Sequence, residues 1–244
     1  MREQIATHFS SLSDVNAAES LRTEGEALIQ RLEAFPAEIQ QIAPRLAEIG
    51  ESLKRILGGQ DESVTHFQVN ALKSRFRAGD KGAVGELVDY LDVMRTQLSE
   101  DDPILLQVSN MAAVGHMHRS EFQQAHEILQ GIVVTAEQNF SANDPAVRQI
   151  NMNLAECIGA LGNPAMAADL LRRELAIRNE VFGQRTREAL RAADKLANFS
   201  FQAGEYEPAL HLAASIFHAR AEEFGAFDRE TLISKRRVIY WQHL

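Results

Sequence analysis

The stretch QAGEYEPALHLAASIF, residues 202–217, contains an alanine, Ala209, that recurs along the chain at a fixed distance. With three earlier alanines it forms an evenly spaced column that gives a 42-residue period: Ala83, Ala125, Ala167 and Ala209. Another column lies twelve positions upstream, at Ala71, Ala113, Ala155 and Ala197. We call the upstream set the first alanine column and the other the second alanine column. Two columns in one register indicate an internal repeat, which is the sequence pattern of a solenoid.

Each 42-residue copy predicts a pair of helices. Asp102-Pro103 and Asp144-Pro145 occupy the same place in successive copies, and Thr186 and Asp228 occupy it later. Asp or Thr at this place caps a helix, and proline suits the first helical position. A helix pair cannot bury its apolar face alone, so the pairs must stack. We expect an all-α fold over 61–244, a right-handed α-solenoid of four 42-residue copies and a terminal helix.

The repeat also resembles a known family. A small residue followed twelve positions later by alanine, with Gly204 and Tyr206 just ahead of it, resembles the tetratricopeptide repeat, whose unit has about 34 residues. The longer unit, and LLRRELAIRNEVFG at 170–183, resemble the kinesin-light-chain variety of that repeat. The resemblance covers about 63–244 and is weakest in the first copy, where Asp80 replaces the aromatic residue. It implies helix pairs stacked around a peptide-binding groove.

Residues 1–60 follow a different period and are expected to form a separate helical region. Apolar residues alternate steps of four and three, at Leu28, Leu32, Phe35, Ile39, Ile42, Leu46, Ile49, Leu53 and Ile56. This pattern alone predicts a coiled coil, which could join two chains into a homodimer through 21–57. However, Pro36 and Pro44 would each cost about 3 kcal/mol inside a continuous helix. We therefore favour short helices that fold onto each other or onto the repeats.

The last segment, DRETLISKRRVIYWQHL at 228–244, matches the first helix of a copy without its second helix. Two interpretations remain open. The segment is either a terminal capping helix, which solenoids need at an open end, or part of a longer protein.

Composition excludes several classes of partner. The net charge of −9 argues against nucleic acid, because phosphate neutralisation needs clustered Lys and Arg. No run approaches the roughly 18 apolar residues of a membrane span, and the N-terminus lacks the apolar region of a leader. The single cysteine, Cys157, forms no intrachain disulfide and fits a reducing compartment. We expect a cytoplasmic protein with no membrane partner.

No catalytic constellation is visible in the sequence. His116 and His118 are two residues apart and would point to different sides of a helix, so we expect one packed and one solvated histidine. Cys157 lies two residues after an alanine of the first column, where a buried, inert thiol is expected. Phosphate loops and serine elbows are missing. We predict no enzymatic activity, no cofactor and no metal.

The family resemblance implies binding positions on the first helix of each pair. Transferred to this chain, these are Gln107, Asn110, Gln149, Asn153, Glu156, Arg191, Asp194, Asn198 and Arg236. Asn153 resembles the asparagine that holds peptide backbone in the kinesin-light-chain variety, because an amide both donates and accepts. Basic residues near the C-terminal end of the groove, such as Lys195 and Arg237, favour an acidic or acidic-aromatic peptide.

The resulting hypothesis is a protein–protein interaction scaffold that holds a peptide or helix of a partner. Two alternatives remain. One is a structural or assembly module that self-associates through its N-terminal helices, and the other is the sensor or adaptor portion of a larger signalling protein or enzyme.

Overall fold

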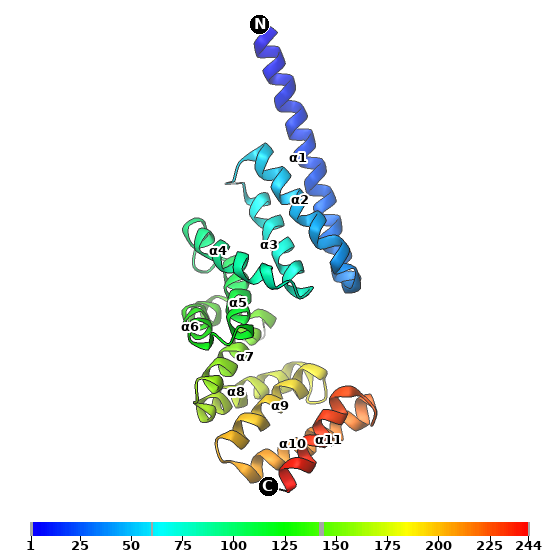
Figure 1. Cartoon of the computed structure of the whole chain (residues 1–244), viewed down its shortest axis with the longest axis vertical. Coiled ribbons are helices and arrows are strands. Elements are labelled where there is room, and N and C mark those ends of the chain that lie inside the picture. The colour runs from blue at the N-terminus through cyan, green and yellow to red at the C-terminus, as the bar shows by residue number, and fades with distance from the viewer. Residues whose placement is uncertain (1, 60, 142–143, 244) are drawn as a thin grey trace. The chain divides into compact units, whose positions relative to one another are not determined.

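The computed structural model describes residues 2–59, 61–141 and 144–243, with side chains at all of these positions except 2–12, 33, 81, 97, 181 and 182. Within these ranges all regular structure is helical, in eleven α-helices and one 3₁₀ helix (Figure 1). The chain divides into two compact units, Met1–Gln97 and Leu98–Leu244. The first helix pair therefore belongs to the unit of the N-terminal helices, whereas the sequence predicted a boundary at residue 60.

The first unit is a helical bundle. It consists of α1 (Arg2–Ala34), η1 (Pro36–Glu38), α2 (Ile39–Leu57), α3 (Glu62–Arg77) and α4 (Lys81–Gln97). The chain leaves α1 at Phe35 and turns through η1, whose first residue is Pro36, so proline stands where its missing N–H is harmless. Pro44 is accommodated inside α2. Helix α2 packs along α3 and against α1, and α4 packs against α3.

The apolar residues that recur in steps of four and three in the N-terminal region pack within the first unit. Ile42, Leu46, Ile49 and Leu53 of α2 are buried, and they pack against Phe67 and its neighbours on α3 and against α1. Helix α1 passes close to α3 at Gly25, where a β-carbon would overlap the ring of Phe67. These apolar side chains therefore meet inside one chain, although α1, with 33 residues, is longer than the short helices expected.

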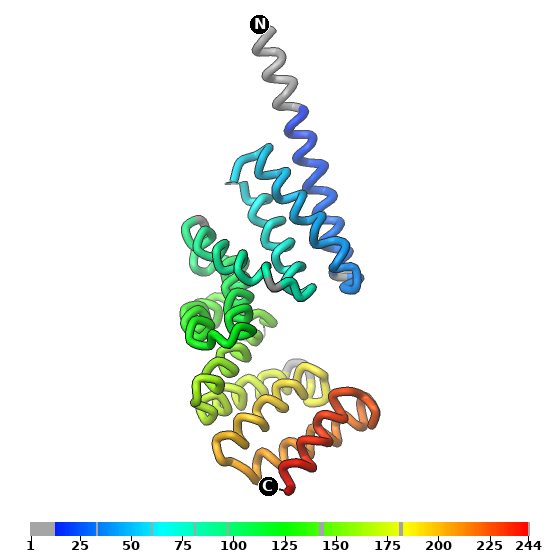
Figure 2. Tube along the Cα trace, viewed as in Figure 1, coloured from blue at the N-terminus to red at the C-terminus, as the bar shows by residue number. Residues whose placement is uncertain are grey.

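The second unit is a row of helix pairs. Its helices are α5 (Pro103–His118), α6 (Phe122–Asn139), α7 (Pro145–Ala160), α8 (Pro164–Phe182), α9 (Arg187–Gln202), α10 (Tyr206–Phe224) and α11 (Arg229–Gln242). Within the unit, consecutive helices pack against each other, as the trace in Figure 2 shows. The predicted caps are confirmed: the side chains of Asp102, Asp144, Thr186 and Asp228 each accept a hydrogen bond from a backbone N–H of the first turn.

The alanine columns are completely buried in the second unit. In the first column Ala113, Ala155 and Ala197 are 0% exposed, and in the second column Ala125, Ala167 and Ala209 are also 0% exposed. Side chains of this size let neighbouring helix backbones approach, while larger residues around them fill the remaining space.

The 42-residue spacing is wrong by one position between the first two copies. The interval between the capping residues Asp61 and Asp102 is one position shorter than the interval between Asp102 and Asp144. The positive-φ turn residues agree, because Gly79 and Ser120 are one position closer together than Ser120 and Gly162. Alanine alone could not reveal this shift, since Ala71 and the residue after it, Leu72, are both buried.

The positive φ of Ser120 leads us to predict a stabilising substitution. Its φ is 62°, whereas its counterparts Gly162 and Gly204 both have φ 90°. This region is unfavourable for residues with a β-carbon, so Ser120→Gly should raise the free energy of unfolding by about 0.5–1 kcal/mol. Urea denaturation monitored by circular dichroism measures the change. The control is Arg119→Gly at φ −90°, which should give no gain. An unchanged midpoint for Ser120→Gly would contradict the strain.

The alanine contacts predict a destabilising substitution. Ala167→Leu adds volume at a completely buried position and should lower the free energy of unfolding by about 1–3 kcal/mol. The matched control is Ala165→Leu, which adds the same atoms on an exposed part of α8. Denaturant titration compares the two. Equal stability of both variants would mean that the second alanine column does not set the helix spacing.

Candidate functional site

The predicted groove residues all lie on the first helices of the pairs in the second unit. Exposed members are Gln107, Gln149, Arg191 and Arg236; partly buried members are Asn110, Glu156, Asp194 and Asn198; and Asn153 is buried. Helix α5 carries Gln107 and Asn110, and α7 carries the next three residues in sequence. Helices α9 and α11 carry the remainder. The first helices thus present a row of polar side chains.

Asn153 is the hydrogen-bonded centre of this row. Its Nδ2 donates to Oδ1 of Asn110 over 2.8 Å, which links α7 to α5. Its Oδ1 accepts a hydrogen bond of 2.9 Å from Nε2 of Gln149. The residue is 4% exposed. A ligand could therefore contact the Asn153 amide only if one of these bonds were exchanged, which differs from the freely presented clamp that the resemblance implied.

The same contact recurs two copies later. Asp194 occupies there the position that Asn110 occupies in its own copy, and Arg237 likewise occupies the position of Asn153. Arg237 donates to the carboxylate of Asp194, which links α11 to α9. The guanidinium of Arg237 also lies 5.6 Å from the centre of the Trp241 ring.

The intermediate step uses a different pair. Met152 occupies the position that Asn110 occupies one copy earlier, where a hydrogen-bond acceptor would be needed. Its thioether is only a weak acceptor. Lys195 of α9 instead pairs with Glu156 of α7. Three successive steps between first helices are therefore bridged by polar side chains, and we call this set of contacts the cross-repeat ladder. Sequence reasoning missed it, although the near-repeat spacing of Asn110 and Asn153 is visible in the sequence.

Three of the predicted residues outside the ladder have no described polar contact. Arg191, Asn198 and Arg236 form no hydrogen bond or ion pair with any residue that the structure describes. Ile233 and Tyr240 occupy on α11 the positions that Arg191 and Asn198 occupy on α9, and both are exposed. Sequence reasoning missed these two, and the 42-residue offset is the signal that identifies them. The free side chains thus gather on α9 and α11.

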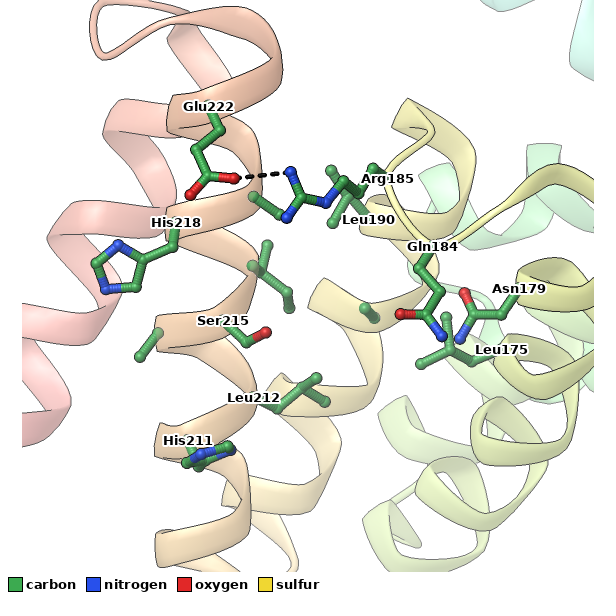
Figure 3. A pocket seen from close by; sticks show the side chains of 14 residues that line it. Leu175, Asn179, Gln184, Arg185, Leu190, His211, Leu212, Ser215, His218 and Glu222 are labelled. Carbon is green, nitrogen blue, oxygen red and sulfur yellow. Dashed lines mark hydrogen bonds and ion pairs between the residues drawn. The ribbon is translucent and has the colours of Figure 1, made fainter.

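A cleft of about 480 Å³ lies between α8 and α10, over α9 (Figure 3). Leu175, Leu190 and Leu212 contribute its apolar lining. At one end Arg185 donates a hydrogen bond of 2.7 Å to Glu222, as the dashed line in Figure 3 marks. None of the predicted groove residues lines this cleft.

The register explains why this space is open. One copy earlier, the positions of Leu190, Ala193 and Ile216 hold Arg148, Asn151 and Glu174. These longer polar side chains are buried. The later copy has shorter or apolar residues at the same places, and the cleft results.

The earlier copy contains a buried charged cluster, formed by Arg148, Glu174 and Arg178 with Asn151. Asn151 donates to Glu174 over 2.9 Å, and a guanidinium nitrogen of Arg148 lies 3.7 Å from the same carboxylate. Burial raises the pKa of Glu174, although the hydrogen bond from Asn151 opposes the shift. Burial also lowers the pKa of Arg178. The charged forms are thus held where solvation is poor.

The candidates for reactive chemistry are packed or exposed as expected. Cys157 is buried, and burial raises the pKa of its thiol to about 12, with the neighbouring Glu156 adding to the shift. His116 is partly buried with Nδ1 2.6 Å from a carboxylate oxygen of Glu121, whereas His118 is exposed. Among the described residues no group of three or more His, Cys, Asp or Glu could hold a metal ion.

The described helices include none that is both long enough and apolar enough to span a bilayer.

Successive helix pairs, alanine contacts and capped first helices define a solenoid of tetratricopeptide-like repeats. Solved structures of this kind resemble the chain. Two crystal structures of a candidate kinesin light chain from Podosopora anserina, with nearly identical TPR-like repeats, superpose with TM-scores of 0.69 and 0.68 at 20% and 19% identity. They cover 84% and 85% of this chain and 96% and 98% of their own.

A further similar structure is BtubC (BKLC) from P. vanneervenii. It has a TM-score of 0.54 at 15% identity and covers 96% of this chain and 84% of its own. None of the family models and none of the curated proteins compared with the chain matches it. The likeness therefore shows the fold, and it agrees with the kinesin-light-chain-like variety that the repeat length predicted.

The ladder predicts a stability change at Asn153. Asn153→Ala removes a buried amide and breaks its hydrogen bonds with partly buried Asn110 and exposed Gln149, so the free energy of unfolding should fall by about 1–3 kcal/mol. Asn198→Ala is the matched control. It removes an amide from a first helix without breaking a described hydrogen bond, and its effect should stay within about 0.5 kcal/mol. Guanidinium denaturation tests both. Equal losses would remove the distinction between ladder and free residues.

Proposed function

We propose that the protein is an interaction scaffold that holds a peptide or helix of a partner protein along the first helices of its second unit. The observation that carries this proposal is that only some polar residues of the first helices are bonded to each other. One set is bonded across the repeats in the ladder, whereas Arg191, Asn198 and Arg236 have no described polar partner. Polar groups that neither hold the fold nor pair with each other are available to a ligand.

The ladder supports binding by fixing the spacing of the first helices. Since Asn110–Asn153 and Asp194–Arg237 tie neighbouring helices together, the free side chains between them start in defined places. Preorganisation of this kind lowers the entropy lost on binding. We assign Asn153 to positioning rather than to direct contact.

The free residues indicate the chemistry of the ligand. The Asn198 amide can donate to and accept from a peptide unit, which is the role first expected of Asn153. Arg191 and Arg236 can each donate two parallel hydrogen bonds to a carboxylate. Exposed Tyr240 on α11 adds an apolar surface beside them. We therefore propose a peptide with acidic side chains, bound across α9 and α11.

The proposal also includes the cellular compartment and the oligomeric state of the protein. The buried free thiol of Cys157 and the net charge of −9 fit a cytoplasmic protein with protein partners. Self-association through 21–57 has less support, because the apolar residues on which it depended pack within the first unit.

A peptide-array experiment tests this function. Arrays of acidic and neutral peptides are probed with the intact chain, and fluorescence anisotropy gives the affinity of the best peptide. The double variant Arg191→Ala, Asn198→Ala should bind at least about 10-fold more weakly, since each lost contact contributes on the order of 1 kcal/mol. Its melting temperature should not change.

Met166→Ala serves as the matched control, because Met166 is exposed on the second helix α8 and lies outside the row. It should leave the affinity unchanged. Wild-type affinity in the double variant, or an equal loss in the control, would refute the assignment of the binding surface.

A further inference from the structure

Helix α11 presents an exposed stripe of apolar residues around a central arginine. Leu232 and Ile233 are each 47% exposed, Ile239 is 48% exposed and Tyr240 is 62% exposed. With Arg236 between them, these residues lie at helical spacings of three and four and therefore on one side of the helix. We call these five residues the α11 stripe.

The other side of α11 is firmly packed. Ser234 is buried and accepts a hydrogen bond of 2.5 Å from Arg220 of α10. The indole of Trp241 stacks on Phe201 of α9, with ring centres 4.3 Å apart and planes 8° apart. The stripe is thus the outer surface of an anchored helix.

The repeat register shows what usually lies on such a surface. Leu232 and Ile239 correspond to Leu190 and Ala197 of α9, which are 4% and 0% exposed because the second helix of the pair, α10, covers them. The stripe therefore includes the positions on which a helix rests in the preceding copy. Isoleucine in place of alanine keeps an incoming helix further away, unless that helix offers a small residue opposite Ile239.

The stripe is basic as well as apolar. Arg236 is its centre, and Arg229 and Lys235 are exposed beside it. The carboxylate of Glu230 is directed to Arg220, at 3.4 Å. No acidic residue belongs to the stripe, although the whole chain carries a net charge of −9. This local sign favours a negatively charged occupant.

We propose that the α11 stripe binds an acidic amphipathic helix of a partner protein, which lies where the second helix lies in the preceding copy. The partner helix places a leucine-like residue on Leu232, a small residue opposite Ile239 and a carboxylate on Arg236. This surface extends beyond the polar row of the proposed function, because Leu232 and Ile239 are not part of that row.

Two other occupants fit the stripe less well. A second copy of α11 in antiparallel orientation would match Leu232 with Tyr240 and Ile233 with Ile239, but the same symmetry places Arg236 against Arg236. A membrane surface prefers cations at the edges of an apolar face. Here Arg236 lies in the middle of the face.

Two synthetic peptides provide the test. Both are 18-residue, end-capped amphipathic helices with a leucine–alanine seam, and one carries glutamate beside the seam where the other carries lysine. With fluorescein labels and the intact chain at low salt, we expect the glutamate peptide to bind at least about 10-fold more tightly, and added salt to weaken it. Arg236→Glu should reverse the preference.

Variants locate the binding surface. Leu232→Asp with Ile239→Asp should reduce binding of the glutamate peptide at least about 10-fold. Val134→Asp with Met166→Asp is the matched control, since these residues are 55% and 54% exposed on the second helices α6 and α8. It should leave binding unchanged. Equal binding of both peptides, or an equal loss in both double variants, would overturn the proposal.

Two further measurements decide between occupants. Sedimentation velocity of the intact chain should show a monomer. A dimer that Leu232→Asp with Ile239→Asp abolishes would mean that a second copy covers the stripe and would overturn the proposal. Co-sedimentation with vesicles of phosphatidylcholine and phosphatidylserine should fail, and vesicle binding lost in the same variant would also overturn it. The Arg191→Ala, Asn198→Ala variant keeps the stripe, so it separates a failure here from a failure of the proposed function.

Discussion

Close contact between helices at alanine is the constraint on which the second unit depends. Ala155 and Ala167 are completely buried, and neither side chain contributes much apolar area by itself. Their effect is geometric: a methyl group lets two helix backbones come near enough for Leu154, Leu171 and similar residues to fill the space around them. A larger residue would separate the helices and loosen every contact of its pair.

Polar residues on the first helices divide into two groups with different tasks. The cross-repeat ladder uses Asn110, Asn153 and the Asp194–Arg237 pair to connect one repeat to the next. Other polar residues of the same helices, such as Asn198, have no described polar partner. The proposed function relies on this division, because the same helices must be both spaced and exposed. The α11 stripe adds an apolar, basic surface at the last helix.

Much of the fold could be predicted from the sequence, because helix caps are local and both the caps and the alanines recur at a nearly constant interval. The shorter interval after the first copy is not visible in the alanines, since Ala71 stands next to Leu72 and either residue fits the column. The site was harder to predict. Asn153 looks like a free amide in sequence, but its amide is bonded to Asn110 and Gln149, which reach it from an adjacent helix and the preceding turn.

The buried cluster of Arg148, Glu174 and Arg178 makes the third pair unlike its neighbours. The pairs on either side hold leucine at the position of Arg148 and isoleucine at the position of Glu174. If genetic recombination exchanged α8 of this pair for its counterpart α10, the Arg148 guanidinium would be enclosed without the Glu174 carboxylate, because isoleucine takes that position. The third pair is therefore similar to its neighbours in shape but not interchangeable with them, because its two helices carry charges that need each other when buried.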